Sequence, residues 1–195
     1  MTTDELDIIS RMRGKVHSRK ADTGVNLFLV WGYPTAIVFL LEFVVLLFLN
    51  KHWYEWFWVG IPLVGIPLMK YFLRKDYNRT GHRTLEASMA LHLWIFIGAA
   101  SAVLGFVTGI TGTYPVCYNF IQGLLIGLGV FLTGVISRFR PMIICGIIAS
   151  VLTFGCLFLQ GDIWPWQFLV TAITAIVAFI IPGHLFKQYT HNYGI

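Results

Sequence analysis

Six long apolar stretches, separated by short polar segments, make up most of the chain. A helix of about 20 apolar residues crosses the ~30 Å hydrocarbon core of a bilayer, and about 17 residues is the lower limit. Each stretch reaches this length; they lie at about 25–49, 57–73, 89–109, 117–137, 141–159 and 166–183. The pattern therefore predicts an all-α integral membrane bundle of six transmembrane helices.

The segments at 50–56, 110–116 and 160–165 are short, so the helices that they join must run antiparallel. We therefore expect three successive helical hairpins. The second stretch is the weakest, because it is short, contains Pro62 and Pro67, and ends at Lys70. We still expect it to span, since neighbouring helices can satisfy the carbonyls that a proline frees and a lysine amine can reach the interface.

Basic residues set the orientation of these helices. Of the 14 lysines and arginines, Lys51 alone falls on one side of the predicted membrane and the others fall on the opposite side. Cytoplasmic segments carry the excess of Lys and Arg, so both termini are predicted to be cytoplasmic. The predicted parts are a basic arm at 1–24, for which a short interfacial helix is one possibility, the six-span domain at 25–183 and a cytoplasmic tail at 184–195.

The composition is not that of a soluble domain. The chain is 57% hydrophobic and only 12% charged, with a mean hydropathy of +0.73. That is more apolar surface than one soluble core can hide, so the expected surroundings are a lipid bilayer. The net charge of +5 comes from residues beside apolar spans, and we do not expect a nucleic-acid partner. The three cysteines have no CxxC spacing and are interpreted as packing residues.

Glu42 is the main candidate for a functional residue, because a carboxylate in the hydrocarbon costs about 2.5–3.5 kcal/mol and needs a partner or a task. It lies about 10 Å below the outer end of the first span, at 1.5 Å per residue. The same depth count brings polar residues of four other spans into this layer: Thr108, Thr111, Asn119, Gln122, Thr153, Thr171 and Thr174.

Two interpretations of this layer stay open. In the first, Glu42 binds a proton, an amine or another cation, with Asn119, Gln122 and Thr171 as further ligand candidates. In the second, Glu42 is protonated and hydrogen-bonded to Gln122 or to a carbonyl. We expect Glu42 to be shielded from lipid in either case, because hydrocarbon offers it no hydrogen bond.

His92 and His184 are predicted near the inner ends of the third and sixth spans. They could share a depth, but Glu42 is about 18 Å away along the membrane normal and cannot be a third metal ligand. We expect ordinary hydrogen-bond partners and no metal.

Glycines indicate where helices approach closely. Gly105 and Gly109 in the third span, and Gly123 and Gly127 in the fourth, are spaced as small-xxx-small pairs. Such pairs let helix backbones come into contact, so we expect these two spans to pack together at the centre of the bundle.

No catalytic or cofactor-binding signature occurs: there is no His-Glu-x-x-His, Gly-x-Ser-x-Gly, P-loop or dinucleotide fingerprint. We therefore expect no catalytic residues and no cofactor. An intramembrane enzyme without a recognisable motif is a third possibility, for which His92 and His184 are the available reactive pair.

Three segments resemble small bacterial multi-spanning inner-membrane proteins of unassigned function. They are Trp31-Gly32-Tyr33-Pro34, the Gly60–Gly65 run, and the glycine-rich fourth span ending in Ser137-Arg138. The resemblance implies a bacterial cytoplasmic membrane and transfers no ligand or catalytic residue.

Two functions lead. The favoured one is a non-enzymatic scaffold, helper or sensor with a cytoplasmic protein partner or self-association. The alternative is a small-solute or ion transporter that uses Glu42. The second predicts a span broken at mid-depth, for which the candidate prolines are Pro34, Pro62 and Pro67.

Overall fold

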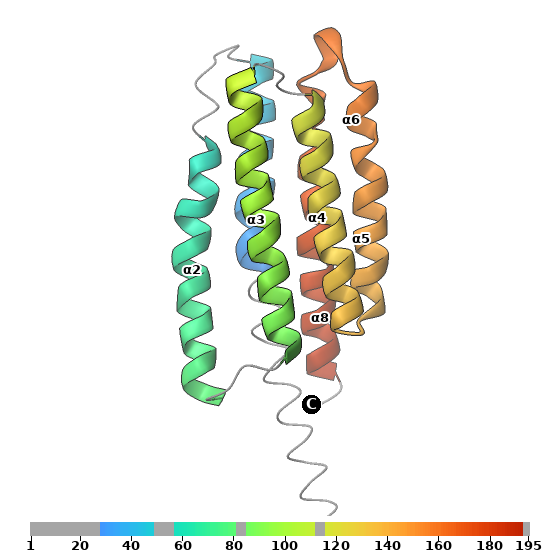
Figure 1. The fold of residues 1–195 in the computed structure, drawn as a ribbon. Helices are drawn as coiled ribbons and strands as arrows, with labels where there is room; N and C mark the ends of the chain where they lie inside the picture. Colours follow the sequence, from blue (N-terminus) through green and yellow to red (C-terminus); the bar gives the residue numbers. More distant parts are fainter. Residues whose placement is uncertain (1–27, 49–56, 81–84, 112–115, 193–195) are drawn as a thin grey trace, which may run out of the picture.

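The computed structural model describes residues 28–48, 57–80, 85–111 and 116–192. These residues form an all-α bundle in which the long helices lie side by side and successive helices run in opposite directions (Figure 1). Five helical segments are long and apolar enough to cross a membrane: Phe28–Phe48, Ser88–Thr108, Tyr118–Ile136, Arg140–Phe158 and Trp166–Tyr189. The chain is therefore of the multi-pass membrane type by helix length and composition.

Helix α2 (Phe57–Thr80) is the element that departs from the six-span expectation, because it is not among those five segments. It is one continuous helix through Pro62 and Pro67, and it extends beyond the predicted end at 73. Its apolar part ends at Lys70, about 20 Å from Phe57 at 1.5 Å per residue, which is short of a full hydrocarbon core.

Helices α4 (Val116–Ile136) and α5 (Arg140–Thr153) form the tightest pair. Arg138, with a φ of 54°, reverses the chain between them, and the Phe139 N–H donates to the Gly134 carbonyl at 2.9 Å. Pro141 lies in the first turn of α5, where its missing N–H has no helical partner to lose. A short helix, α6 (Gly155–Phe158), continues α5 after a break at Phe154.

The C-terminal span changes its helix type near its middle. It consists of α7 (Trp166–Ala175), one π-helical turn, η3 (Ile176–Ile180), and α8 (Ile181–Asn192), and a 3-10 turn, η2 (Gly161–Ile163), precedes it. Pro182 lies two residues after the π turn. Because proline lacks an N–H and its ring crowds the carbonyl four residues earlier, at Ala178 within the turn, a wider turn is an expected local response. The irregular span is thus this one, whereas the candidate prolines of the sequence were Pro34, Pro62 and Pro67.

The first described helix, which we label α1 (Phe28–Phe48), packs against the C-terminal span through two glycines. A Cβ on Gly32 would lie 2.6 Å from the Phe179 Cβ, and a Cβ on Gly183 would lie 2.9 Å from a Leu29 methyl carbon. Helix α2 touches the first helix where Gly65 lies against the Trp31 ring. The C-terminal span therefore contacts α1, α4 and α5, whereas α2 lies at the edge of the bundle (Figure 1).

Helix α3 (Leu85–Thr111) is attached mainly near its middle by Trp94. The Trp94 ring packs edge-on to Phe28 and against Phe179, and its indole N–H donates to the Thr133 hydroxyl at 3.1 Å. Only 6% of the apolar stretch of α3 is buried, against 44% for α4 and 50% for the C-terminal span. Most of its surface is apolar and open, as a lipid-facing helix requires.

Candidate functional site

Glu42 lies on α1 and is completely buried, with 0% of its surface exposed. Its shielding from lipid was expected from the energetic cost alone and is confirmed. Its neighbours Phe39 and Phe43 pack against Phe168 and Trp166 of α7, with ring centroids 6.3 and 5.2 Å apart. Glu42 is also close enough to Tyr118 of α4 to interact with it electrostatically. The carboxyl group is thus enclosed where α1, α4 and α7 meet.

Neither carboxyl oxygen of Glu42 has a hydrogen-bond partner among the described residues. The predicted structural bond from a protonated Glu42 to Gln122 or to a carbonyl is therefore not made in this arrangement. The Gln122 Oε1 atom is itself buried and also lacks a described donor. A buried polar group without a partner costs about 1–3 kcal/mol, and more if it is charged, so packing alone gives this carboxyl no stabilising role.

A buried amide pair joins α4 and α7, two of the helices that enclose Glu42. Asn119 on α4 donates from Nδ2 to the Gln167 Oε1 on α7 at 3.3 Å, and both residues are 0% exposed. Gln167 in turn donates from Nε2 to the Leu159 carbonyl at 2.6 Å, just after α6 ends. Helix ends leave such carbonyls unpaired, and this one is satisfied by the side chain. The Asn119 Oδ1 atom remains without a described donor.

Thr171, the fourth predicted ligand, lies one turn after Gln167 and is buried. Its hydroxyl donates to the Gln167 carbonyl at 2.8 Å, and the hydroxyl of Thr174 does the same to Val170 at 2.9 Å. The hydroxyl protons of both threonines are therefore used within their own helix, so Thr171 can offer a ligand only a lone pair of its oxygen.

The chemistry of this site is that of unpaired oxygen acceptors. The buried orphan atoms on α1 and α4 are both carboxyl oxygens of Glu42, Asn119 Oδ1 and Gln122 Oε1. Asn119 and Gln122 are three residues apart, which puts them on neighbouring positions of one helix surface. Carboxylate and amide oxygens are the ligands that hard cations take, and a carboxyl group takes a proton. We call Glu42, Asn119, Gln122, Gln167 and Tyr118 the buried polar cluster.

Gln167 and Tyr118 belong to this cluster but were absent from the sequence-based set. Gln167 is the second residue of α7, at the edge of an apolar run, where a polar residue looks like part of the loop. A tyrosine in a membrane helix is common near either interface, so Tyr118 gave no particular signal. The depth count that selected Asn119 would also have included both.

The two histidines are separate. His92 is exposed and donates from Nδ1 to the Ser88 carbonyl of its own helix at 2.7 Å. His184 shares a hydrogen bond of 2.9 Å between its Nε2 and the hydroxyl of Tyr33 on α1. Within the described ranges, no three His, Cys, Asp or Glu residues are grouped in a way that could hold a metal ion.

The predicted glycine seam joins a different pair of helices. A Cβ on Gly123 would clash with Thr153, and one on Gly127 would clash with the Ser150 hydroxyl and lie 2.8 Å from the Ser150 backbone nitrogen. Both glycines therefore face α5, and the expectation that they meet the third span is wrong. Toward α3, α4 presents Gly129, which lies against Ile97 and Trp94.

Gly105 of α3 does face α4, because its Cβ position lies 3.5 Å from the Tyr118 ring, but the contact is with a side chain and not with a backbone. Gly109 follows one turn later in α3. The close helix approach is thus between α4 and α5, and α3 rests on α4 through side chains.

Comparisons with known proteins give no relative for this chain. No protein-family description matches it. No curated protein matches it, and no solved structure matches it. The resemblance to small bacterial inner-membrane proteins therefore stays a proposal.

Proposed function

We propose that this chain is a six-span protein of a bacterial cytoplasmic membrane, with both termini inside, that binds a proton or a small cation at Glu42 and carries it through the membrane. The observation that supports the proposal most is the complete burial of Glu42 without any described hydrogen-bond donor. A polar group that is retained at such a cost in a membrane helix is expected to have a task.

The surrounding residues favour a cation over an anion. The cluster offers orphan acceptor oxygens on α1 and α4. Within the described side chains, no lysine, arginine or histidine is paired with Glu42. An anion would meet only repulsion from the carboxylate, whereas a proton or a cation would be stabilised by it.

A transport role has a second support in the irregular C-terminal span. The π turn at Ile176–Ile180 interrupts regular helix geometry between the buried cluster and the inner end of the bundle. Such turns are frequent at functional sites, and interrupted spans are typical of transporters. The burial of Glu42 corresponds, in this proposal, to a closed state that must open to exchange its ion.

Flux through reconstituted vesicles tests the role of Glu42. Purified protein is placed in lipid vesicles, a gradient of protons, sodium or potassium is imposed, and the internal pH or ion content is followed. Wild-type vesicles should show flux above that of empty vesicles for one of these ions. Glu42→Gln should abolish it, since the amide keeps the shape but cannot ionise, while thermal unfolding in detergent shows that the variant folds.

Thr174→Val is the matched control, because Thr174 is equally buried on α7 but the hydrogen bond that its hydroxyl makes among the described residues is to the Val170 carbonyl of its own helix. It should retain the flux. Wild-type vesicles that behave like empty ones, or a folded Glu42→Gln protein with full flux, would overturn the proposal. Infrared difference spectra add an independent readout: a carboxyl band that changes with pH or cation should be missing in Glu42→Gln.

Reporter fusions test the topology separately. Fusions at residue 195 and within 74–88 should behave as cytoplasmic, and fusions within 50–56 and 160–165 as external. An external C-terminus would mean an odd number of spans and would remove α2 from the count, since it is the least apolar of the long helices.

A further inference from the structure

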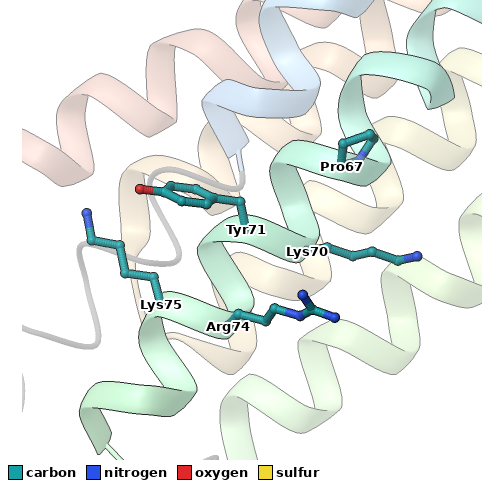
Figure 2. Close-up of a pocket in the computed structure, with 5 residues that line it drawn as sticks. All are labelled: Pro67, Lys70, Tyr71, Arg74 and Lys75. Atoms are coloured by element: carbon teal, nitrogen blue, oxygen red, sulfur yellow. The ribbon is translucent and has the colours of Figure 1, made fainter.

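The lower half of α2 carries a cationic surface that plays no part in the Glu42 site. A hollow of about 510 Å³ is lined there by Pro67, Lys70, Tyr71, Arg74 and Lys75, all from this one helix. Figure 2 shows the Lys70 and Arg74 side chains extending on one flank of the helix and Tyr71 with Lys75 on the other. Lys70, Tyr71, Arg74 and Lys75 are all exposed. We call these four residues the basic surface of α2.

The charges of this surface are close together and lack a described counterion. Lys70 and Arg74 are four residues apart, so they lie on the same helix face, where like charges repel and disfavour the helix. Among the described side chains, neither of them forms an ion pair with a carboxylate. Lys75 instead lies with its Nζ 6.0 Å from the centre of the Tyr71 ring, at the range of a cation–π contact. An anion bound between Lys70 and Arg74 would relieve the repulsion between them.

The position of the surface in the bundle selects the anion. Directly above it, α2 exposes Leu63, Val64, Ile66 and Leu68, which only hydrocarbon can cover favourably. The change from apolar to cationic residues at Lys70 therefore marks the boundary between acyl chains and headgroups. Tyrosine is the residue expected at that boundary, and Tyr71 lies there with 59% of its surface exposed.

We infer that the basic surface of α2 binds the phosphate of an anionic phospholipid, with Lys70 and Arg74 contacting the phosphate and the acyl chains lying along the apolar face above. The guanidinium of Arg74 offers paired N–H donors to phosphate oxygens, and Lys70 adds a point charge that can extend from a greater depth.

Retention of lipid by the purified protein tests this inference. The full chain is extracted from vesicles that contain equal amounts of phosphatidylglycerol and phosphatidylcholine, and the lipids bound after washing are counted by native mass spectrometry. Wild type should retain phosphatidylglycerol in preference. Each charge removed should weaken that preference about fivefold, so Lys70→Gln combined with Arg74→Gln should nearly abolish it.

Arg138→Gln combined with Arg140→Gln is the matched control, since it removes the same charge from the α4–α5 turn. It should leave the preference unchanged, and Lys70→Arg with Arg74→Lys should restore it because the charge returns. Equal losses in the Gln pairs of both sites would show a general charge effect and overturn the inference. Displacement of the lipid by millimolar glycerol phosphate would instead identify a site for free phosphate and would equally overturn it.

Discussion

The seam between α4 and α5 and the outer face of α3 are both rich in small residues, yet they are packed in opposite ways. In the seam, Gly127 and Gly134 bring α4 onto the backbone of α5, and Gly123 lies against the Thr153 side chain. A Cβ added to Gly146 of α5 would lie 2.5 Å from the Phe131 backbone nitrogen of α4. On α3, a Cβ added to Gly98 meets nothing within 4 Å. The same residue type therefore marks the closest contact in one region and open surface in the other.

The difference shows what brings two membrane helices together. Apolar side chains gain little by leaving lipid for one another, so close approach depends on shape and on backbone contact. The seam provides this on both helices, because glycines of α4 meet Gly146 and Ser150 of α5. On α3, Gly98 faces open space and Gly105 meets the Tyr118 side chain, so this helix is attached through side chains such as Trp94.

The largest expected effect is in the seam. Gly127→Leu and Gly134→Leu should each lower the unfolding free energy by about 2–3 kcal/mol or more, because the new side chains meet α5 backbone atoms that cannot move aside. Gly134 should tolerate leucine no better than Gly127, since a Cβ on Gly134 would lie 2.7 Å from the Ile143 backbone nitrogen. Gly98→Leu should change stability by less than about 0.5 kcal/mol.

Thermal and denaturant unfolding in one detergent measure the three variants side by side. If Gly98→Leu were as harmful as Gly127→Leu, the outer face of α3 would be in contact with protein, and the contrast between the two regions would fail.

The sequence predicts the membrane class and most helix positions, because apolar length alone determines which segments can cross a bilayer. It places the helix Val116–Ile136 within one residue of the predicted 117–137. It is poorer for α2, where a helix continues to Thr80 through polar residues that no hydrocarbon requires. It cannot say which neighbour a glycine faces: the spacing of Gly123 and Gly127 defines one side of a helix, and only the assembled bundle puts α5 there.

The candidate site was predictable in part for a similar reason. Burial of Glu42 follows from energetics, since every exposed alternative in lipid costs more. The depth count also selected Asn119, which the structure joins to Gln167. The depth count could not reveal that the Thr171 hydroxyl donates its proton to the Gln167 carbonyl of the same helix, because that bond depends on the side-chain rotamer and not on depth.

A smaller effect is expected at Trp94, which attaches α3 to the bundle by ring contacts and a hydrogen bond. Trp94→Ala should lower stability by about 1–2 kcal/mol, because it removes the ring contacts with Phe28 and Phe179 and the bond to Thr133. Trp94→Phe should cost only about 0.6 kcal/mol, the usual contribution of one hydrogen bond in a membrane bundle.

Phe96→Ala is the control, since Phe96 has a similar ring that is 67% exposed. Unfolding in detergent, together with cross-linking of a cysteine pair between α3 and α4, reports whether α3 has separated. A Trp94→Ala protein as stable as Phe96→Ala would mean that other contacts hold α3.

The smallest effect is expected where α2 meets α1, and two glycines of the same helix provide the comparison. Gly65 lies against the Trp31 ring, because a Cβ added to it would lie 2.8–3.0 Å from three ring atoms. A Cβ added to Gly60 would meet no atom within 4 Å. Because the ring lies at the end of a side chain that can turn aside, Gly65→Leu should lower global stability by less than about 1 kcal/mol.

Gly65→Leu should nevertheless loosen α2, which the amide hydrogen exchange of residues 61–72 would show as faster exchange. Gly60→Leu should leave that exchange unchanged or slower, since leucine favours helix more than glycine does. Equal exchange in the two variants would mean that Trp31 does not hold α2, and the edge of the bundle would then be fixed by lipid alone.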